Sequence, residues 1–254
     1  MQITRFERGL RDRVALVTGA AIGNGRAFCE RLAEEGAKLV IADLEEAVDT
    51  ERAVLELGGE VVSIRADMTD PADVERVVRT AIERYGHIDI LVHNVGHYSE
   101  EPFELLSFAE WKKTLEITLD SIFHTVRAVL PHMKRAGFGR IITFSSDTVW
   151  LGTPYLTHYV TAKMGVIGFT RSLAAEVGKY GITVNTITVG LTATQNAGTS
   201  SVMSPLLEHI IPAQAVHRAD EPEDIANVVA FLALPASGII TGQTINVDGG
   251  VARH

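Results

Sequence analysis

Tyr159 and Lys163 stand four residues apart in Tyr-Val-Thr-Ala-Lys, so on a helix both side chains would lie on one face. A free tyrosine has a pKa of about 10, whereas a general acid or base works best near the working pH. A cation one turn away favours the phenolate, so we expect Lys163 to lower the pKa of Tyr159. Ser146 ends an apolar run upstream and could hold a substrate oxygen beside the phenol. The three residues predict proton transfer to or from an oxygen atom.

A glycine-rich turn follows the first apolar run, residues 14–18. Glycine permits positive φ and lets the backbone approach a ligand closely, and the N-terminus of the following helix attracts phosphate. The position of the turn, directly after a strand, predicts a site for the pyrophosphate of a dinucleotide. The alternative is a tight turn whose glycines only pack helix against strand. The turn comprises Gly19, Ala20, Ala21, Ile22, Gly23, Asn24 and Gly25.

Polar residues also end the next apolar runs. Asp43 ends the second, where an acid accepts hydrogen bonds from the hydroxyls of the adenosine ribose. No lysine or arginine directly follows it, so we expect NAD rather than NADP; the alternative is an acid that caps a helix. Asp67 ends the third run and could reach the adenine, or could be a loop or cap acid. Asn94 and Gly96 end the fourth.

Short β-branched runs alternate with amphipathic segments throughout the chain. Such alternation is typical of βαβ units and of a parallel sheet covered on both faces. No linker or repeat interrupts it, so we expect one domain over residues 1–254, with a substrate lid near 192–218, where no single period holds. Strands are expected at 14–18, 38–43, 61–67, 89–94, 140–146, 182–189 and 243–248, and helices at 25–36, 45–57, 70–86, 108–136 and 157–179.

The composition excludes several classes of protein. With 23 basic and 32 acidic residues the net charge is −9, which argues against nucleic acid or an anionic membrane as the main partner. Cys29 is the only cysteine, so no intrachain disulfide is possible and a reducing, cytoplasmic location is expected. No apolar run is long enough to span a membrane. His93 and His97 have no companion ligands, so we expect no metal site.

Taken in order, TGAAIGNG, HNVG, Ser146, Tyr159-xxx-Lys163 and residues 189–194 resemble the short-chain dehydrogenase/reductase family over essentially the whole chain. The resemblance implies an α/β Rossmann sheet with strand order 3-2-1-4-5-6-7, nicotinamide hydride transfer and a homotetramer. It makes Tyr159 the general acid/base, Ser146 the residue that orients the substrate oxygen, and Lys163 a ligand of the nicotinamide ribose. The cofactor contacts that it implies are Gly19, Ile22, Gly23, Asn24, Gly25, Asp43, Leu44, Asp67, Met68, Asn94, Gly96, Tyr159, Lys163, Thr192 and Thr194.

The sequence departs from the family pattern at a few positions. Thr118 stands where the resemblance places a catalytic asparagine that supports a water chain to the lysine. A threonine is shorter and β-branched, so this relay is in question, although the serine, tyrosine and lysine are intact. His93, Val95 and Val189 also differ from the family pattern, and we interpret them as packing changes.

The substrate pocket is expected at the carboxyl ends of the strands, under the lid. Its candidate lining is mainly apolar and aromatic, which predicts a neutral, hydrophobic ketone or secondary alcohol. The stretch WLGTPYLTHYVTAK, the WKKTLEI segment, the methionine-bearing lid and the terminal ARH together resemble 1-phenylethanol dehydrogenases within the family. Cyclic or terpenoid alcohols, quinone-like carbonyls and ring ketones are the alternative substrates. The rival hypotheses are a 3-oxoacyl-type carbonyl reductase and a catalytically weak dinucleotide sensor. The candidate lining residues are His97, Tyr98, Asp147, Trp150, Leu151, Tyr155, Leu191, Met203, Leu206 and Leu207, with Trp150 also readable as wall packing.

Overall fold

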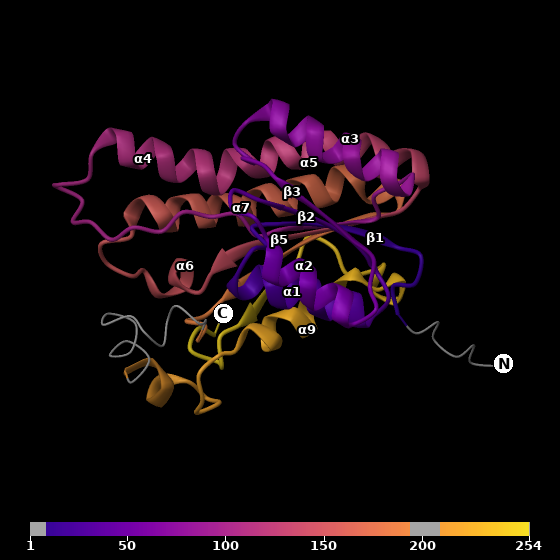
Figure 1. The fold of residues 1–254 in the computed structure, drawn as a ribbon. Coiled ribbons are helices and arrows are strands. Elements are labelled where there is room, and N and C mark those ends of the chain that lie inside the picture. Colours follow the sequence, from indigo (N-terminus) through magenta and orange to yellow (C-terminus); the bar gives the residue numbers. More distant parts are fainter. Residues whose placement is uncertain (1–8, 194–208, 254) are drawn as a thin grey trace.

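A computed structural model of the chain describes residues 9–193 and 209–253. Seven parallel strands form one sheet in the order β3-β2-β1-β4-β5-β6-β7, which confirms the expected fold class (Figure 1). The apolar, β-branched runs explain the strands, because such side chains pack well on a sheet that is covered on both faces. The strands are β1 Val14–Thr18, β2 Lys38–Asp43, β3 Val61–Arg65, β4 Ile90–His93, β5 Gly139–Ser146, β6 Ile182–Val189 and β7 Thr244–Val247.

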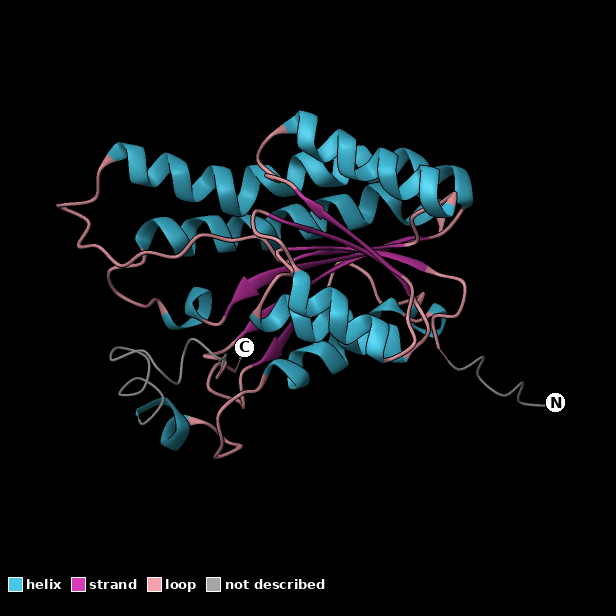
Figure 2. Ribbon diagram, viewed as in Figure 1, coloured by secondary structure: helices cyan, strands magenta, loops and turns pink. Residues whose placement is uncertain are grey.

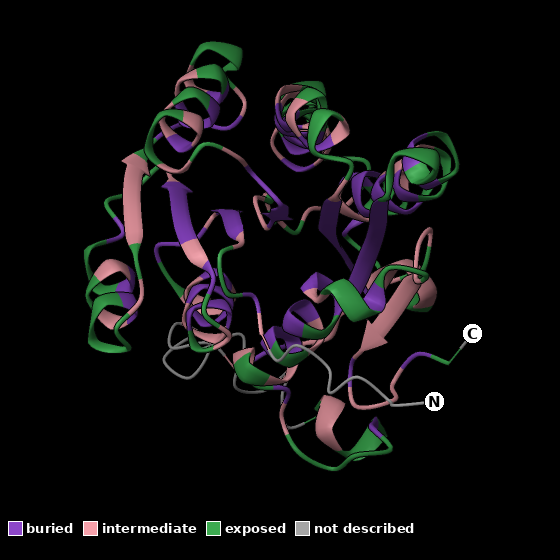
Figure 3. Cartoon of the chain, turned by 90° about the vertical axis from the view of Figure 1, so that its right-hand side faces the viewer, coloured by how far each residue is buried: buried purple, intermediate pink, exposed green. Residues whose placement is uncertain are grey.

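Helices cover both faces of this sheet, which forms the middle layer (Figure 2). Alternate side chains of β1 serve the two faces: Ala15 and Val17 pack on one side, Val14 and Leu16 on the other. The central strands are buried, whereas the edge strands β3 and β7 are partly exposed (Figure 3). One face carries α1 Gly23–Glu34, α2 Val48–Glu56 and α9 Pro222–Ala233; the other carries α3 Pro71–Tyr85, α4 Phe108–Leu115, α5 Ser121–Ala136 and α7 Thr157–Val177.

The strand order reverses direction between β1 and β4. In the parallel register Thr18, at the end of β1, lies between Ala42 of β2 and His93 of β4. The residues that follow these three strands therefore meet at one crevice, where open α/β sheets bind ligands. This topology brings the glycine-rich turn, Asp43 and Asn94 together.

The helix predicted over residues 108–136 is not one regular α-helix. Five residues between α4 and α5, Glu116–Asp120, form a π-helical turn, with Thr118 in its middle. Such turns are frequent at functional sites. The helix α9 was not predicted, although Glu221 and Asp224 form a capping box around Pro222 at its start. The short helix α6, Thr148–Leu151, was not predicted either.

Local signals account for the helix boundaries that were predicted well. The Asp70 side chain accepts a hydrogen bond from the Ala72 N–H, and Pro71 occupies the first position of α3. Gly86 ends that helix in the left-handed conformation, with φ of 84°.

Cys29 is fully buried on α1, and burial raises the pKa of its thiol. Within the described part of the chain, no helix combines the length and hydropathy needed to span a membrane.

Candidate active site

The glycine-rich turn is shaped for a ligand with a phosphate group. Gly19 has φ of 64°, and a Cβ on Gly25 would lie 2.7 Å from Ala20 Cα and still closer to the Gly19 carbonyl oxygen. The turn can therefore pack against α1 only because these residues lack side chains. Asn24 has a buried side-chain oxygen with no hydrogen-bond partner, while the Ile22 side chain is 65 % exposed. An orphaned polar atom and an exposed apolar side chain in this crevice fit a dinucleotide.

Asp43 is tied to the glycine-rich turn by its own carboxylate. Its Oδ2 accepts a hydrogen bond from the Ala21 N–H at 2.8 Å and its Oδ1 one from the Glu45 N–H at 3.1 Å. It does not cap α2, whose N-cap position is Ala47. Both oxygens of the Asp43 carboxylate keep spare lone pairs that can accept hydrogen bonds from the ribose hydroxyls.

Sequence reasoning missed a cation beside Asp43. Arg65 lies opposite Asp43 in the register of β2 and β3, and its Nε donates to the Leu44 carbonyl oxygen at 2.8 Å. Its position next to Asp43 comes from the pairing of β2 with β3, not from spacing along the chain. A cation at this end of the crevice bears on the choice between NAD and NADP.

The residues at the ends of β3 and β4 have defined local partners. Asp67 Oδ1 accepts hydrogen bonds from the N–H and hydroxyl of Thr69, as a loop acid would, and Met68 is buried. Asn94 donates from Nδ2 to the Gly19 carbonyl oxygen at 2.8 Å, which fixes the turn from the far side. A Cβ on Gly96 would lie 3.4 Å from Lys163 Nζ, so this glycine leaves room for the lysine head group.

His93 belongs to a hydrogen-bond chain that links the first strand to the π-helical turn. The Asn94 N–H donates to Thr18 Oγ1 at 3.3 Å, and Thr18 Oγ1 lies 3.3 Å from His93 Nδ1. His93 Nε2 lies 3.0 Å from Ser121 Oγ, which donates to the Ile117 carbonyl oxygen at 2.6 Å. Because the Ser121 proton goes to the Ile117 carbonyl oxygen, His93 must be the donor at Nε2. Burial, with the charge of Lys163, lowers the pKa of His93 to about 3.

Tyr159 and Lys163 lie one turn apart at the start of α7, as predicted. Lys163 Nζ is 5.6 Å from the centre of the Tyr159 ring and donates to the Phe144 carbonyl oxygen at 3.0 Å. Lys163 is buried, and this burial lowers its pKa to about 8. The ammonium therefore lies beside the phenol at the end of β5.

The pKa of Tyr159 is not lowered, contrary to the expectation from the position of Lys163. Burial raises the pKa of Tyr159 to about 12, and the Ser146 hydroxyl is the group that lowers it. The charge of Asp147 acts in the opposite direction and raises it. Desolvation disfavours the phenolate more than these polar neighbours favour it.

Ser146 is buried at the end of β5, and its hydroxyl has three hydrogen-bond contacts besides the one with the Tyr159 phenol. It accepts from the Thr148 N–H at 3.3 Å and from Thr148 Oγ1 at 2.9 Å, and it donates to Asp147 Oδ1 at 3.2 Å. Asp147 is 6 % exposed, and burial raises its pKa to about 6. From the sequence, Asp147 was predicted only to line the substrate pocket.

Thr118 contacts the loop that follows β4. It is fully buried, and its Oγ1 accepts a hydrogen bond from the His97 N–H at 3.1 Å. His97 Nε2 lies 2.7 Å from Glu110 Oε1, and Ser99 Oγ donates to the same oxygen at 2.8 Å. Ser99 Oγ also lies 2.9 Å from Nε2 of His158, the residue before the tyrosine. This network, which the sequence did not reveal, ties the loop after β4 to α4 and α7.

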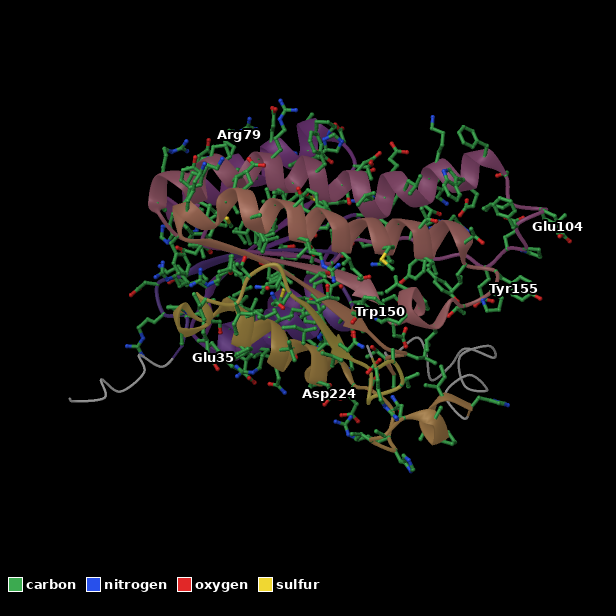
Figure 4. All side chains as sticks on the ribbon, turned by 180° about the vertical axis from the view of Figure 1, so that it is seen from behind. Glu35, Arg79, Glu104, Trp150, Tyr155 and Asp224 are labelled. Atoms are coloured by element: carbon green, nitrogen blue, oxygen red, sulfur yellow. The ribbon has the colours of Figure 1, made fainter. Side chains whose placement is uncertain are left out.

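The predicted pocket residues are not all brought together. The Tyr98 ring meets the Tyr159 ring edge-on, with centres 5.3 Å apart. Trp150 donates from its indole to Asn246 Oδ1 at 3.1 Å, which fits wall packing. Tyr155 is 58 % exposed and its carbonyl oxygen pairs with the Glu101 N–H, so it lies toward the edge that carries Glu104, apart from Trp150 (Figure 4).

The described lid residues converge on a buried acid that sequence reasoning did not identify. Thr192 is buried and forms an isolated parallel bridge with Asp220. Asp220 Oδ1 accepts from Gln214 Nε2 at 3.2 Å, and burial together with the charge of Asp248 raises its pKa to about 6. Leu191 is half-buried. Thr194, Met203, Leu206 and Leu207 lie outside the described residues. No group of three or more histidine, cysteine or acidic side chains is placed to hold a metal ion in residues 9–193 and 209–253.

Comparison with known proteins places this site in context. A family model described as "Enoyl-(Acyl carrier protein) reductase" matches residues 19–252. Short-chain reductase protein NovJ of Streptomyces niveus is 39 % identical, over 94 % of each chain. (2S)-[(R)-hydroxy(phenyl)methyl]succinyl-CoA dehydrogenase subunit BbsD of Thauera aromatica is 38 % identical, over 95 % of this chain and 97 % of that one.

Two further similarities cover nearly the whole length. A 3-oxoacyl-[acyl-carrier-protein] reductase of Synechocystis is 34 % identical, over 95 % of this chain and 98 % of that one. The crystal structure of levodione reductase superimposes with a TM-score of 0.87 at 33 % identity, covering 96 % of this chain and 98 % of the other.

Proposed function

Because the chain belongs to the short-chain dehydrogenase/reductase family, we propose that it interconverts a hydrophobic secondary alcohol and its ketone with NAD(H). The observation that carries this proposal is the placement of Ser146, Tyr159 and Lys163 together at the carboxyl end of the sheet, beside the glycine-rich turn. When bound, the nicotinamide exchanges a hydride with the carbinol carbon of the substrate. All other steps fall to the chain's own residues.

The crevice residues divide the binding of the cofactor among them. The glycine-rich turn, with Asn24 and the N-terminus of α1, receives the pyrophosphate. Asp43 accepts the adenosine ribose hydroxyls, and Ile22 packs against the dinucleotide. Lys163, for whose head group Gly96 leaves room, donates a hydrogen bond to the nicotinamide ribose.

Tyr159 carries the proton of the substrate oxygen. With a pKa of about 12 the phenol is protonated at neutral pH, which suits donation to a ketone. Oxidation of an alcohol needs the phenolate instead. Ser146 holds the substrate oxygen next to the phenol.

The surroundings of the site favour a neutral substrate. Tyr98 and Trp150 present aromatic surface, and Asp147, Asp220 and Asp248 place carboxylates close to one another behind Ser146. These carboxylates repel an anionic substrate. The name of the Thauera relative contains a hydroxy(phenyl)methyl group, which supports an aryl secondary alcohol.

A 3-oxoacyl-type carbonyl reductase is the second candidate, and the name of the Synechocystis relative favours it. Arg65 beside Asp43 is compatible with NADP, which would suit this activity. The net charge of −9 opposes docking of an acidic carrier protein. A weak dinucleotide sensor is the third candidate, suggested by Thr118 in place of asparagine.

The test is NADH or NADPH absorbance with 1-phenylethanol, acetophenone, alicyclic ketones and a 3-oxoacyl thioester. We expect turnover of the aryl or ring compounds with NAD(H), and Tyr159→Phe should abolish it while leaving cofactor binding intact. Turnover of the thioester alone with NADPH would favour the reductase. Cofactor binding without any turnover would favour the sensor.

We also infer a homotetramer that buries the outer face of the long helices. Phe108 of α4, Phe123 of α5 and Met164 of α7 are 74 %, 49 % and 41 % exposed, respectively. Exposed apolar side chains on adjacent helices are typical of a protein interface. Light scattering coupled to size-exclusion chromatography measures the state, and a monomer would contradict the inference.

A further inference from the structure

We infer that Asp147 is a positioning residue whose carboxylate competes with the substrate oxygen for the single proton of the Ser146 hydroxyl. The inference rests on the proposed function, because it concerns how Ser146 holds that oxygen. It assigns to Asp147 a part in setting the pH range of carbonyl reduction.

The one proton of the Ser146 hydroxyl already has two acceptors, Asp147 and the oxygen of Tyr159, whose pKa it lowers. A hydroxyl has one proton to donate and two lone pairs to accept with. The N–H and hydroxyl of Thr148 donate to Ser146 Oγ, at 3.3 and 2.9 Å. Its one proton can go to Asp147 Oδ1, at 3.2 Å. A ketone oxygen, which can only accept, must take this proton away from the carboxylate.

The carboxylate is held firmly in this position. Asp147 directly follows β5, its N–H donates to the Val189 carbonyl oxygen at 3.1 Å, and its side chain is 6 % exposed. The adjoining turn of α6 begins at Thr148, so the donors to Ser146 and the acceptor from it belong to one short segment. Asp147 cannot swing into solvent without breaking this segment.

Burial and like charges disfavour the charge of Asp147, whereas hydrogen bonds from the Ser146 hydroxyl and from the N–H groups of Thr148 and of Asp147 itself favour it. Asp248, after β7, and Asp220, before α9, carry like charges, and the Tyr159 phenol faces it from α7. Arg218 acts on Asp220 from an exposed ion pair with Asp224. Burial and these like charges raise the pKa of Asp147 to about 6, so its protonation changes close to neutral pH.

Protonation of Asp147 has two consequences for the site. A neutral carboxyl is a weaker acceptor than a carboxylate, so the Ser146 proton becomes available to the substrate oxygen. The loss of negative charge also removes the effect by which Asp147 raises the pKa of Tyr159. Carbonyl reduction should therefore be fastest below the pKa of Asp147.

The kinetic test compares Asp147→Asn with the wild-type protein. In the wild type we expect kcat/KM for ketone reduction to fall by up to about tenfold for each pH unit above about pH 6. In Asp147→Asn this fall should vanish, and the variant should exceed the wild type by about tenfold or more near pH 8. Asp220→Asn is the matched control: it removes a neighbouring like charge without touching Ser146, so it should move the fall to lower pH and keep it. An Asp147→Asn profile identical to the wild-type profile overturns the inference.

A second measurement needs no substrate and so separates this inference from the proposed function. Titration of tyrosinate absorbance, with the Tyr159→Phe protein subtracted to remove the other four of the chain's five tyrosines, gives the pKa of Tyr159. Asp147→Asn should lower that pKa, because the charge is gone and the freed Ser146 proton stabilises the phenolate. In a Ser146→Ala background the lowering should be smaller, as a double-mutant cycle would show. If no ketone is reduced, the proposed function fails; if Asp147→Asn leaves the pKa of Tyr159 unchanged, the role of Asp147 fails.

Discussion

Replacing Asp43 by asparagine should change the cofactor preference from NAD toward NADP. The substitution keeps the shape of the side chain but removes its charge and one of its two acceptor oxygens. It leaves Arg65 in place, bonded to the Leu44 carbonyl oxygen opposite Asp43. The adenosine end of the crevice then loses one negative charge and keeps the guanidinium of Arg65.

The magnitude follows from the contacts of Asp43. A hydrogen bond to a charged group contributes about 1 kcal/mol more than one to a neutral group, so loss of charge toward two ribose hydroxyls weakens NAD by about 2 kcal/mol. The charge also repels a 2′-phosphate about 5 Å away by about 3 kcal/mol at an effective dielectric constant near 20, and exposure to solvent roughly halves this. Together the ratio of the two dissociation constants should shift by about 3 to 4 kcal/mol, or at least about a hundredfold.

The assay is a fluorescence titration with NADH and NADPH for the wild type, Asp43→Asn and Asp43→Asn/Arg65→Ala. The double variant should lose most of the gain in NADPH affinity if Arg65 supplies the cation. Asp43 also accepts from the Ala21 N–H at 2.8 Å, so circular dichroism must show that Asp43→Asn is folded. A ratio within about threefold of the wild-type ratio would refute the role of Asp43 as ribose acceptor.

Three further predictions concern the same crevice and its lid. Because burial lowers the pKa of Lys163 to about 8, NADH affinity in fluorescence titrations should fall as pH rises through about 8, and a flat profile would contradict an ammonium contact. Gly25→Ala should weaken dinucleotide binding by at least about tenfold, since its Cβ would collide with Gly19, whereas Gly168→Ala, with no atom within 4 Å of the added Cβ, should bind normally in the same titrations. The pKa of Asp220 is raised from 3.8 to about 6 in the folded protein. Between these pH values the folded protein keeps a proton that the unfolded chain has lost, so the free energy of unfolding falls as the pH rises across that range. Asp220→Asn should therefore increase the free energy of unfolding in urea by up to about 3 kcal/mol at pH 7 and by little below about pH 4; an equal gain at both pH values would contradict this.

The strand ends were the most predictable part of the site. Parallel strands meet at one edge, so Gly19, Asp43, Asn94 and Ser146 could be placed together from local patterns alone. Arg65 was not predicted, because its proximity to Asp43 depends on the register between two strands. No spacing along the chain reveals that register.

The features that could not be predicted from the sequence depend on the tertiary structure. The pair Tyr159 and Lys163 was predicted from helical spacing, but the pKa of Tyr159 depends on how deeply the fold buries the phenol. The π-helical turn around Thr118 was invisible, because one extra residue in a long helix does not disturb the apolar pattern enough to show. Asp220 lies just beyond the segment 192–218, and nothing in the local pattern indicated that it would be buried.

The hydrogen-bond chain through His93 has a fixed polarity. At one end the Asn94 N–H can only donate, and at the other the Ile117 carbonyl oxygen can only accept. Because Ser121 gives its proton to Ile117, it accepts from His93 Nε2, and a neutral His93 then accepts at Nδ1 from Thr18. A proton wire needs an end that takes up a proton and an end that releases one, and this chain has neither. These hydrogen bonds therefore hold the start of the glycine-rich turn to the π-helical turn, and they do not carry protons to the reaction.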